Sequence, residues 1–142
     1  MTRIDFYFNV EDKFRQAAEL AEIALKKQRR LFMLTSDAEA ASLLETTLWS
    51  HPPTGFLPHC RSDHALASET PIVIDWRDQP PPQDDILVNL TATRPAFFSR
   101  FKGLVELVGL DEADRAEARA RFRYYRDRGY DLHTHDQAEE RT

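Results

Sequence analysis

The stretch PIVIDWRDQPPPQDDILVNL, residues 71–90, holds two short apolar runs separated by a proline-rich loop. Both runs, 71–75 and 86–90, are rich in β-branched residues and have turn-forming residues at their ends. Short runs that are apolar throughout are typical of strands buried on both faces, as in parallel sheets covered by helices. We therefore expect two central strands of such a sheet here.

The residues before this stretch alternate between strand and helix patterns. Apolar and polar residues alternate at 3–8, which predicts a strand, and 31–34 is a short apolar run that predicts another. Apolar residues recur at helical spacing over 11–29, without proline or glycine. A further helix is expected to follow Ser36 or Asp37, either of which can cap it, and to end near position 49.

The residues after the stretch predict a helix at 97–108 and a final helix capped by Asp111. We expect 133–136 to form an edge strand or part of the tail, and the polar residues 136–142 to be frayed. Strands that alternate with helices predict one domain, 1–142, with a three-layer α/β/α fold and a mostly parallel sheet.

The composition of the chain limits the classes of protein to which it can belong. The chain has 142 residues, a net charge of −5 and one cysteine. It has no apolar run near the roughly 20 residues that a membrane-spanning helix needs, and its N-terminus lacks a secretory pattern. A single cysteine fits a reducing compartment, so we expect a cytoplasmic protein without a membrane partner. The acidic total disfavours direct binding of nucleic acid.

Motifs for catalysis and cofactor binding are missing from the sequence. Only four glycines occur, and neither GxGxxG, GxxxxGK[ST] nor GxSxG is present, so a nucleotide-binding-like sheet would lack its phosphate-binding loop. His59, Cys60 and His64 have irregular spacing for a metal site. We predict no catalytic residue, cofactor or metal.

The segment 115–130, RAEARARFRYYRDRGY, contains six arginines against two acids. On a helix, Arg115, Arg119, Phe122 and Arg126 fall on one stripe. The opposite stripe consists of small or aromatic residues that we expect to pack on the sheet: Ala113, Ala116, Ala120 and Tyr124. The arginine stripe would then face water as a docking surface for an anionic partner, with an aromatic or apolar pocket beside it.

Two aromatic residues, Trp49 and Phe56, bracket a proline-rich loop. Aromatic residues are enriched at interface hot spots, but they also plug the edges of cores. The residues alone leave both alternatives open.

Four motifs in matching order and spacing, DFYF (5–8), LWSHPPTGFLPH (48–59), DILVNL (85–90) and FRYYRDRGYDL (122–132), together resemble the chi subunit of the bacterial DNA polymerase III holoenzyme. The resemblance implies a non-catalytic accessory protein of the clamp loader, with a nucleotide-binding-like fold that binds no nucleotide. It also implies two partners, the psi subunit and the acidic C-terminal tail of single-stranded DNA-binding protein, which ends in phenylalanine.

The resemblance also implies site residues. The family's tail-binding positions fall on Arg115, Arg119, Phe122 and Val108, and its surface for psi, or for a competing helicase, falls on Trp49 and Phe56. Two departures occur: Arg115 replaces a lysine and keeps the charge, while Phe122 replaces a tyrosine and loses a hydroxyl.

Two other functions stay open at this stage. One is a small cytoplasmic α/β enzyme, hydrolase-like, with an unrecognised active site. The other is direct binding of DNA by the arginine-rich helix, which the acidic total charge disfavours.

Overall fold

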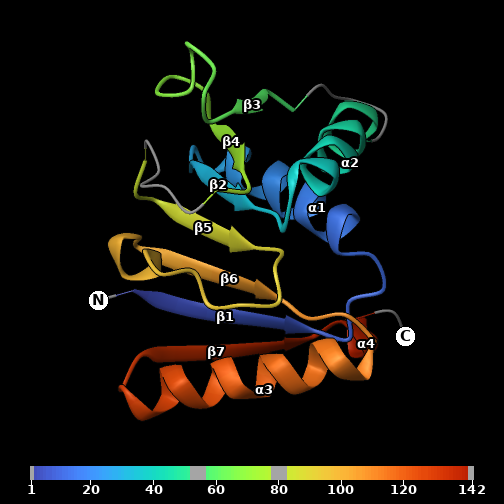
Figure 1. Cartoon of the computed structure of the whole chain (residues 1–142), viewed down its shortest axis with the longest axis vertical. Helices are drawn as coiled ribbons and strands as arrows, with labels where there is room; N and C mark the ends of the chain where they lie inside the picture. The colour runs from blue at the N-terminus through green and yellow to red at the C-terminus, as the bar shows by residue number, and fades with distance from the viewer. Residues whose placement is uncertain (1, 52–56, 78–82, 141–142) are drawn as a thin grey trace.

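Seven parallel strands form a single sheet in the computed structural model, which describes residues 2–51, 57–77 and 83–140 (Figure 1). The strands are β1 (Arg3–Phe8), β2 (Leu31–Leu34), β3 (His59–Arg61), β4 (Ile72–Asp75), β5 (Ile86–Asn89), β6 (Gly103–Leu107) and β7 (Asp131–Asp136). Their order across the sheet is β3-β4-β2-β5-β6-β1-β7, and each neighbouring pair is parallel. The expected parallel α/β sheet is confirmed.

Helices cover both faces of this sheet. They are α1 (Lys13–Lys26), α2 (Ala38–Ser50), the short 3₁₀ helix η1 (Phe98–Arg100), α3 (Glu112–Asp127) and α4 (Gln137–Glu140). The alanine-rich face of α1 and the leucines of α2 form one hydrophobic core with the near face of β2, β4 and β5. The second core, on the opposite face, contains Phe98 of η1 and Tyr125 of α3. The molecule therefore has the three layers that the sequence predicts.

The two apolar runs, 71–75 and 86–90, contain strands β4 and β5, as predicted. β4 and β5 do not pair with each other, because each pairs with one side of β2. All four residues of β4 are buried, as are the last three of β5. The predicted helix caps agree in part. Asp37, rather than Ser36, accepts a hydrogen bond from the backbone N–H of Ala40 at 2.8 Å, whereas Asp111 stands at the N-cap of α3 without a capping hydrogen bond from its side chain.

The predicted helix at 97–108 is wrong. Only η1 is helical there, and the remainder is β6, which lies between β5 and β1. Both faces of β6 are covered, so its apolar residues point to either side and its sequence lacks the alternation that would distinguish a strand from a buried helix. Leu104 and Glu106 point to the core under α3, while Val105 and Leu107 belong to the other core.

The C-terminal segment has regular structure where the sequence predicts fraying. Asp136 is the last residue of β7, and its carboxylate accepts a hydrogen bond from the Asn9 side chain at 2.9 Å. α4 follows directly, and 141–142 lie outside the described residues. Positions 133–136 are part of β7, which is an edge strand, as one of the two alternatives predicts. None of the helices in the described part of the chain has the length and apolarity needed to span a membrane.

Candidate functional site

Helix α3 packs on the sheet through a different face from the one the sequence predicts. Ala113, Ala116 and Ala120 are exposed, and the buried residues are Ala118, Arg121 and Tyr125. The expected packing of the alanine stripe is therefore wrong. A carboxylate of the sheet is buried at this point. An arginine and a tyrosine can pair with it and hydrogen-bond to it, whereas alanines would leave it without a partner.

That carboxylate belongs to Glu106 in the middle of β6. Its Oε1 lies 3.2 Å from Nε of Arg121 and accepts a 2.8 Å hydrogen bond from Asn89, and its Oε2 accepts one from the Tyr125 hydroxyl at 2.7 Å. Burial raises the pKa of Glu106, while the charge of Arg121 and these hydrogen bonds act in the opposite direction. Arg121 also donates to the carbonyl of Ala92 at 2.6 Å, so it ties α3 to the loop after β5.

Because α3 packs on the sheet through Ala118, Arg121 and Tyr125, four predicted site residues lie together. Arg115, Arg119 and Phe122 of α3 and Val108, which follows β6, all line one pocket of about 360 Å³. Residues of β1 and β7 complete the wall: Phe6, Phe8, Asn9 and Thr134, with Ala118 of α3 between them. Arg115 and Arg119 of the arginine stripe thus lie at the margin between the helix and the sheet, with the expected apolar pocket beside them, whereas Arg126 pairs with Asp127 and does not line the pocket.

The pocket combines an apolar floor with a basic rim. The rings of Phe6 and Phe122 meet edge to face with centroids 5.2 Å apart, and Val108 is buried beside them. Ala118 has a small side chain and leaves the space open. This floor can receive an aromatic or large aliphatic side chain.

The two rim arginines are held differently. Nη2 of Arg115 donates to Oδ1 of Asn9 at 2.7 Å, which fixes the guanidinium against the end of β1 and leaves its other N–H groups for a ligand. Nη2 of Arg119 donates to Oε1 of Glu112 at 2.8 Å, and both side chains are exposed. This hydrogen bond lowers the pKa of Glu112. An exposed pair of this kind contributes little to stability, so an anionic ligand can displace Glu112 easily.

Sequence reasoning missed the pocket residues that come from the first strand. Phe6, Phe8 and Asn9 were visible only as the end of an alternating strand. β1 pairs with both β6 and β7, and this pairing carries its phenylalanines under α3. The even-numbered apolar positions of β1 were the available signal, but they do not say which helix covers them.

The second predicted surface is described only in part. Trp49 lies near the end of α2 and is 68% exposed, which disagrees with a role as a core plug. Phe56 lies outside the described residues. In Figure 1, α2 and α3 lie at opposite ends of the molecule, so the Trp49 surface and the α3 pocket are separate.

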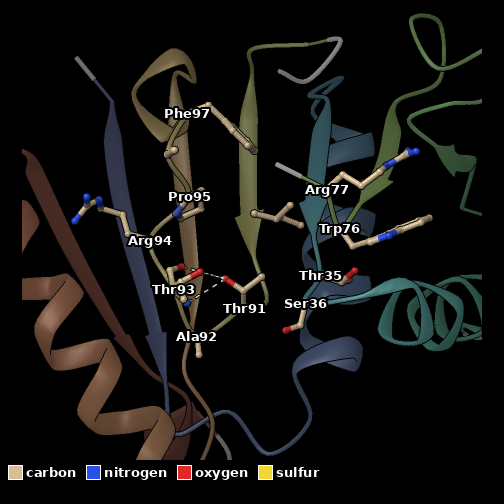
Figure 2. Close-up of a pocket in the computed structure, with 12 residues that line it drawn as sticks. Thr35, Ser36, Trp76, Arg77, Thr91, Ala92, Thr93, Arg94, Pro95 and Phe97 are labelled. Atoms are coloured by element: carbon tan, nitrogen blue, oxygen red, sulfur yellow. Dashed lines mark hydrogen bonds between the residues drawn. The ribbon is translucent and has the colours of Figure 1, made fainter. Parts of the chain in front are cut away.

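A larger pocket of about 440 Å³ opens at the carboxyl ends of β2, β4 and β5, the usual ligand position in open α/β sheets (Figure 2). Several of its polar groups already have partners inside the protein. Thr91 donates to Asn89 at 2.6 Å, and Arg77 donates to Asp75 at 2.9 Å. None of the described residues that line it is a glycine, which is the residue that lets the backbone approach a nucleotide phosphate closely.

The histidines and the cysteine do not form a metal site among the described residues. Cys60 lies in β3, and the rings of His59 and His64 hydrogen-bond to nearby backbone groups, the carbonyl of Leu57 at 2.7 Å and the N–H of Leu66 at 3.0 Å respectively.

One solved structure is similar in fold to this chain although its sequence identity is low. The C-terminal domain of the DEAD-box protein Dbp5 superposes with a TM-score of 0.65 over 97% of this chain and 91% of that one, at 13% identity. At this identity the likeness concerns the fold alone, and it agrees with the parallel α/β architecture.

Sequence comparison identifies the family. The family model for the DNA polymerase III chi subunit, HolC, matches residues 1–133. The DNA polymerase III subunit chi of Pseudomonas aeruginosa is 33% identical over 139 residues, which cover 95% of this chain and 96% of that protein. Its counterparts in Haemophilus influenzae and Escherichia coli are 29% and 26% identical, over 91% and 82% of this chain and 93% and 80% of their own lengths. The chain therefore belongs to the family of the DNA polymerase III chi subunit.

Proposed function

We propose that this chi-family chain is a non-catalytic adaptor of the polymerase III clamp loader, which binds the acidic C-terminal tail of single-stranded DNA-binding protein in the α3 pocket. The observation that supports this most is that Arg115, Arg119, Phe122 and Val108 line a single pocket. The hydrolase-like alternative, in contrast, has no support from the family to which the chain belongs.

The chemistry of the pocket suits such a tail. The terminal phenylalanine of the tail would lie on Phe6, Phe122 and Val108, where burial of its ring provides the apolar part of the affinity. The terminal carboxylate and the preceding aspartates would accept hydrogen bonds from Arg115 and Arg119, since guanidinium groups bind carboxylates in a bidentate manner. The missing hydroxyl at Phe122 removes one hydrogen bond but keeps the ring contact.

The adaptor role needs a second, distant surface. We assign it to the exposed Trp49 on α2, together with Phe56, for binding the psi subunit. A helicase that bound the same surface would compete with psi. Because α2 and α3 lie at opposite ends of the molecule (Figure 1), one chain could hold both partners at once. The cytoplasm, where such a complex replicates DNA, is the proposed location.

A peptide titration tests tail binding. A labelled acidic peptide that ends in phenylalanine should bind the wild-type chain, and Arg119→Glu should weaken it by at least about thirtyfold, because a charge-assisted pair is replaced by repulsion. The melting temperature should stay nearly constant, since an exposed substitution of this kind changes stability by about 0.5 kcal/mol or less.

The matched control is Arg15→Glu on α1, which makes the same charge change at another exposed arginine. Equal losses in the two variants, or wild-type affinity in Arg119→Glu, would show that the α3 pocket is not the docking site. A peptide without its terminal phenylalanine should also bind poorly to the wild-type chain.

A further inference from the structure

Two arginines stack on one tyrosine at the other flank of α3. The guanidinium carbons of Arg94, in the loop after β5, and of Arg128, which caps α3, each lie 3.6 Å from the ring centre of Tyr124. Two planar groups this close to one ring centre cannot occupy the same face, so they lie on opposite faces with their charges about 7 Å apart. We call these three residues the arginine sandwich.

The arginine sandwich has no charge compensation within the described part of the chain. No carboxylate there lies within ion-pair distance of Arg94 or Arg128, whereas Arg119, Arg121 and Arg126 of α3 each have one. Arg94 and Arg128 are exposed, and Tyr124 is half-buried. Cation–π stacking therefore holds two like charges beside each other, and a bound anion would relieve their repulsion.

The arginine sandwich is separate from the α3 pocket. Phe122 and Tyr124 are two positions apart, or 200° around the helix, so they point to different flanks. Tyr124 instead lies against η1, where the Phe98 ring is 6.4 Å from it, and the exposed Arg100 of η1 adds a third cation without a carboxylate partner among the described residues. Arg94 also lines the strand-end pocket, and Figure 2 shows its guanidinium on the side of that pocket away from Trp76 and Arg77.

We propose that the arginine sandwich binds the phosphate backbone of single-stranded DNA. Both faces of Tyr124 are covered by guanidinium groups, so the surface offers no aromatic face to a peptide side chain, in contrast to the α3 pocket. The outer faces of the guanidinium groups can stack on nucleobases, and their edges can donate to phosphates. A DNA polymerase III subunit operates next to this polymer, which repeats its charges along an extended chain.

The proposal is compatible with the acidic net charge, because its positive charges are local. The net charge of −5 describes the whole chain, while Arg94 and Arg128 on the two faces of Tyr124 form a local cationic surface. The rest of the molecule repels the polymer, so the contact is weak on its own and sensitive to salt. The proposal does not depend on tail binding in the α3 pocket.

Fluorescence anisotropy with a labelled oligothymidylate tests the proposal. The wild-type chain should bind at low salt, with log K falling against log salt at a slope of about −1.4 if two phosphates are contacted. Arg94→Ser and Arg128→Ser should each reduce the steepness of the slope by about 0.7, and the double variant should lose about tenfold in affinity at low salt. Arg15→Glu, compared with Arg128→Glu, controls for the total charge of the chain.

Three results would overturn the proposal. The first is a wild-type chain that does not bind the oligonucleotide at low salt. The second is an equal loss of affinity in Arg15→Glu and Arg128→Glu. The third is a loss of affinity in Arg115→Ser and Arg119→Ser that the variants of the arginine sandwich do not show. If an acidic peptide without a terminal aromatic residue bound the arginine sandwich while the oligonucleotide did not, the surface would be assigned to a protein partner instead. Melting temperatures close to that of the wild-type chain must accompany a supporting result, because it then reflects lost contacts rather than lost folding.

Discussion

Tyr125 donates its phenolic hydroxyl to Oε2 of Glu106 at 2.7 Å, and both side chains are fully buried. This hydrogen bond crosses from α3 to the centre of the sheet and fixes the rotation of the helix about its axis. Phe122, one residue after Arg121, consequently lies over Phe6, and Arg115 and Arg119 line the pocket rim. A buried polar contact thus positions the face of α3 that we propose for docking.

Removing this hydroxyl should destabilise the protein. Tyr125→Phe leaves one oxygen of the buried Glu106 carboxylate without its donor, which should lower the free energy of unfolding by about 1–3 kcal/mol in urea denaturation. Tyr124→Phe is a matched control, because no hydrogen bond from the Tyr124 hydroxyl is found among the described residues. Equal stabilities for the two variants would contradict the structural role of the contact.

Removing the positive charge of Arg121 should lower the free energy of unfolding more than removing the Tyr125 hydroxyl does. Arg121→Met leaves Glu106 as a buried carboxylate without its counter-charge, and breaking one side of such a pair typically costs about 3–5 kcal/mol. Glu106→Leu combined with Arg121→Met removes both charges, and it should recover a large part of this loss. A double variant no more stable than Arg121→Met alone would argue against a coupled pair.

Asp75 should make stability depend on pH in the acid range. Its carboxylate is buried, and although burial acts to raise its pKa, hydrogen bonds from Ser62 and Arg77 hold the pKa below the ordinary value of 3.8. The ionised group therefore stabilises the fold at neutral pH, and this contribution is lost as the pH falls below about 3.8 towards the folded pKa. Asp75→Asn should be less stable than wild type at about pH 7, with the difference narrowing towards about pH 3.

Asp63→Asn serves as the control for this prediction. Asp63 lies 3.7 Å from the same Arg77 but is exposed, so its replacement should change stability little at either pH. A difference between wild type and Asp75→Asn that stays constant with pH would contradict the assigned cause.

Salt should separate the two parts of tail binding. High salt screens the contacts of Arg115 and Arg119 but leaves burial of the peptide's phenylalanine intact, so the wild-type complex should weaken only partly. Phe122→Ala should lose this salt-resistant remainder, by about thirtyfold if the residue is a hot spot, while Phe122→Leu should keep part of it. Complete loss of wild-type binding at high salt would show that the apolar floor contributes nothing.

Truncating Trp49 should affect partner binding rather than folding. Because Trp49 is 68% exposed, Trp49→Ala should leave the melting temperature nearly unchanged while weakening psi binding by about thirtyfold. Leu43→Ala, an exposed residue on another side of α2, is the control. A large fall in the melting temperature of Trp49→Ala would favour the core-plug alternative.

Local patterns predicted most of the fold. Alternation identified β1, and apolar runs identified β2, β4 and β5, because each of these strands carries its pattern in its own residues. β6 was missed because it is central: with neighbours on both edges and cores on both faces, its apolar residues point both ways and show no strand period. The strand order likewise depends on contacts between distant segments, which local patterns do not contain.

The candidate site was predicted for reasons that differ from residue to residue. Helical spacing placed Arg115, Arg119 and Phe122 together, whereas Val108 came only from the resemblance to the chi family. The face of α3 that packs on the sheet was predicted wrongly, because small residues indicated the buried side. The deciding partner is Glu106, whose position under α3 follows only from β6 being a strand, and the residues of β6 alone do not indicate this.

The most direct test of the proposed adaptor role is a pull-down of single-stranded DNA-binding protein by the purified chain. Two forms of the prey are compared, the intact protein and one that lacks its acidic C-terminal tail, and Arg119→Glu and Arg15→Glu serve as the site variant and its charge-matched control. We expect the wild-type chain and Arg15→Glu to capture only the intact protein, and Arg119→Glu to capture neither form. Equal capture of intact and tail-less protein by the wild-type chain, or capture of neither, would contradict the proposal.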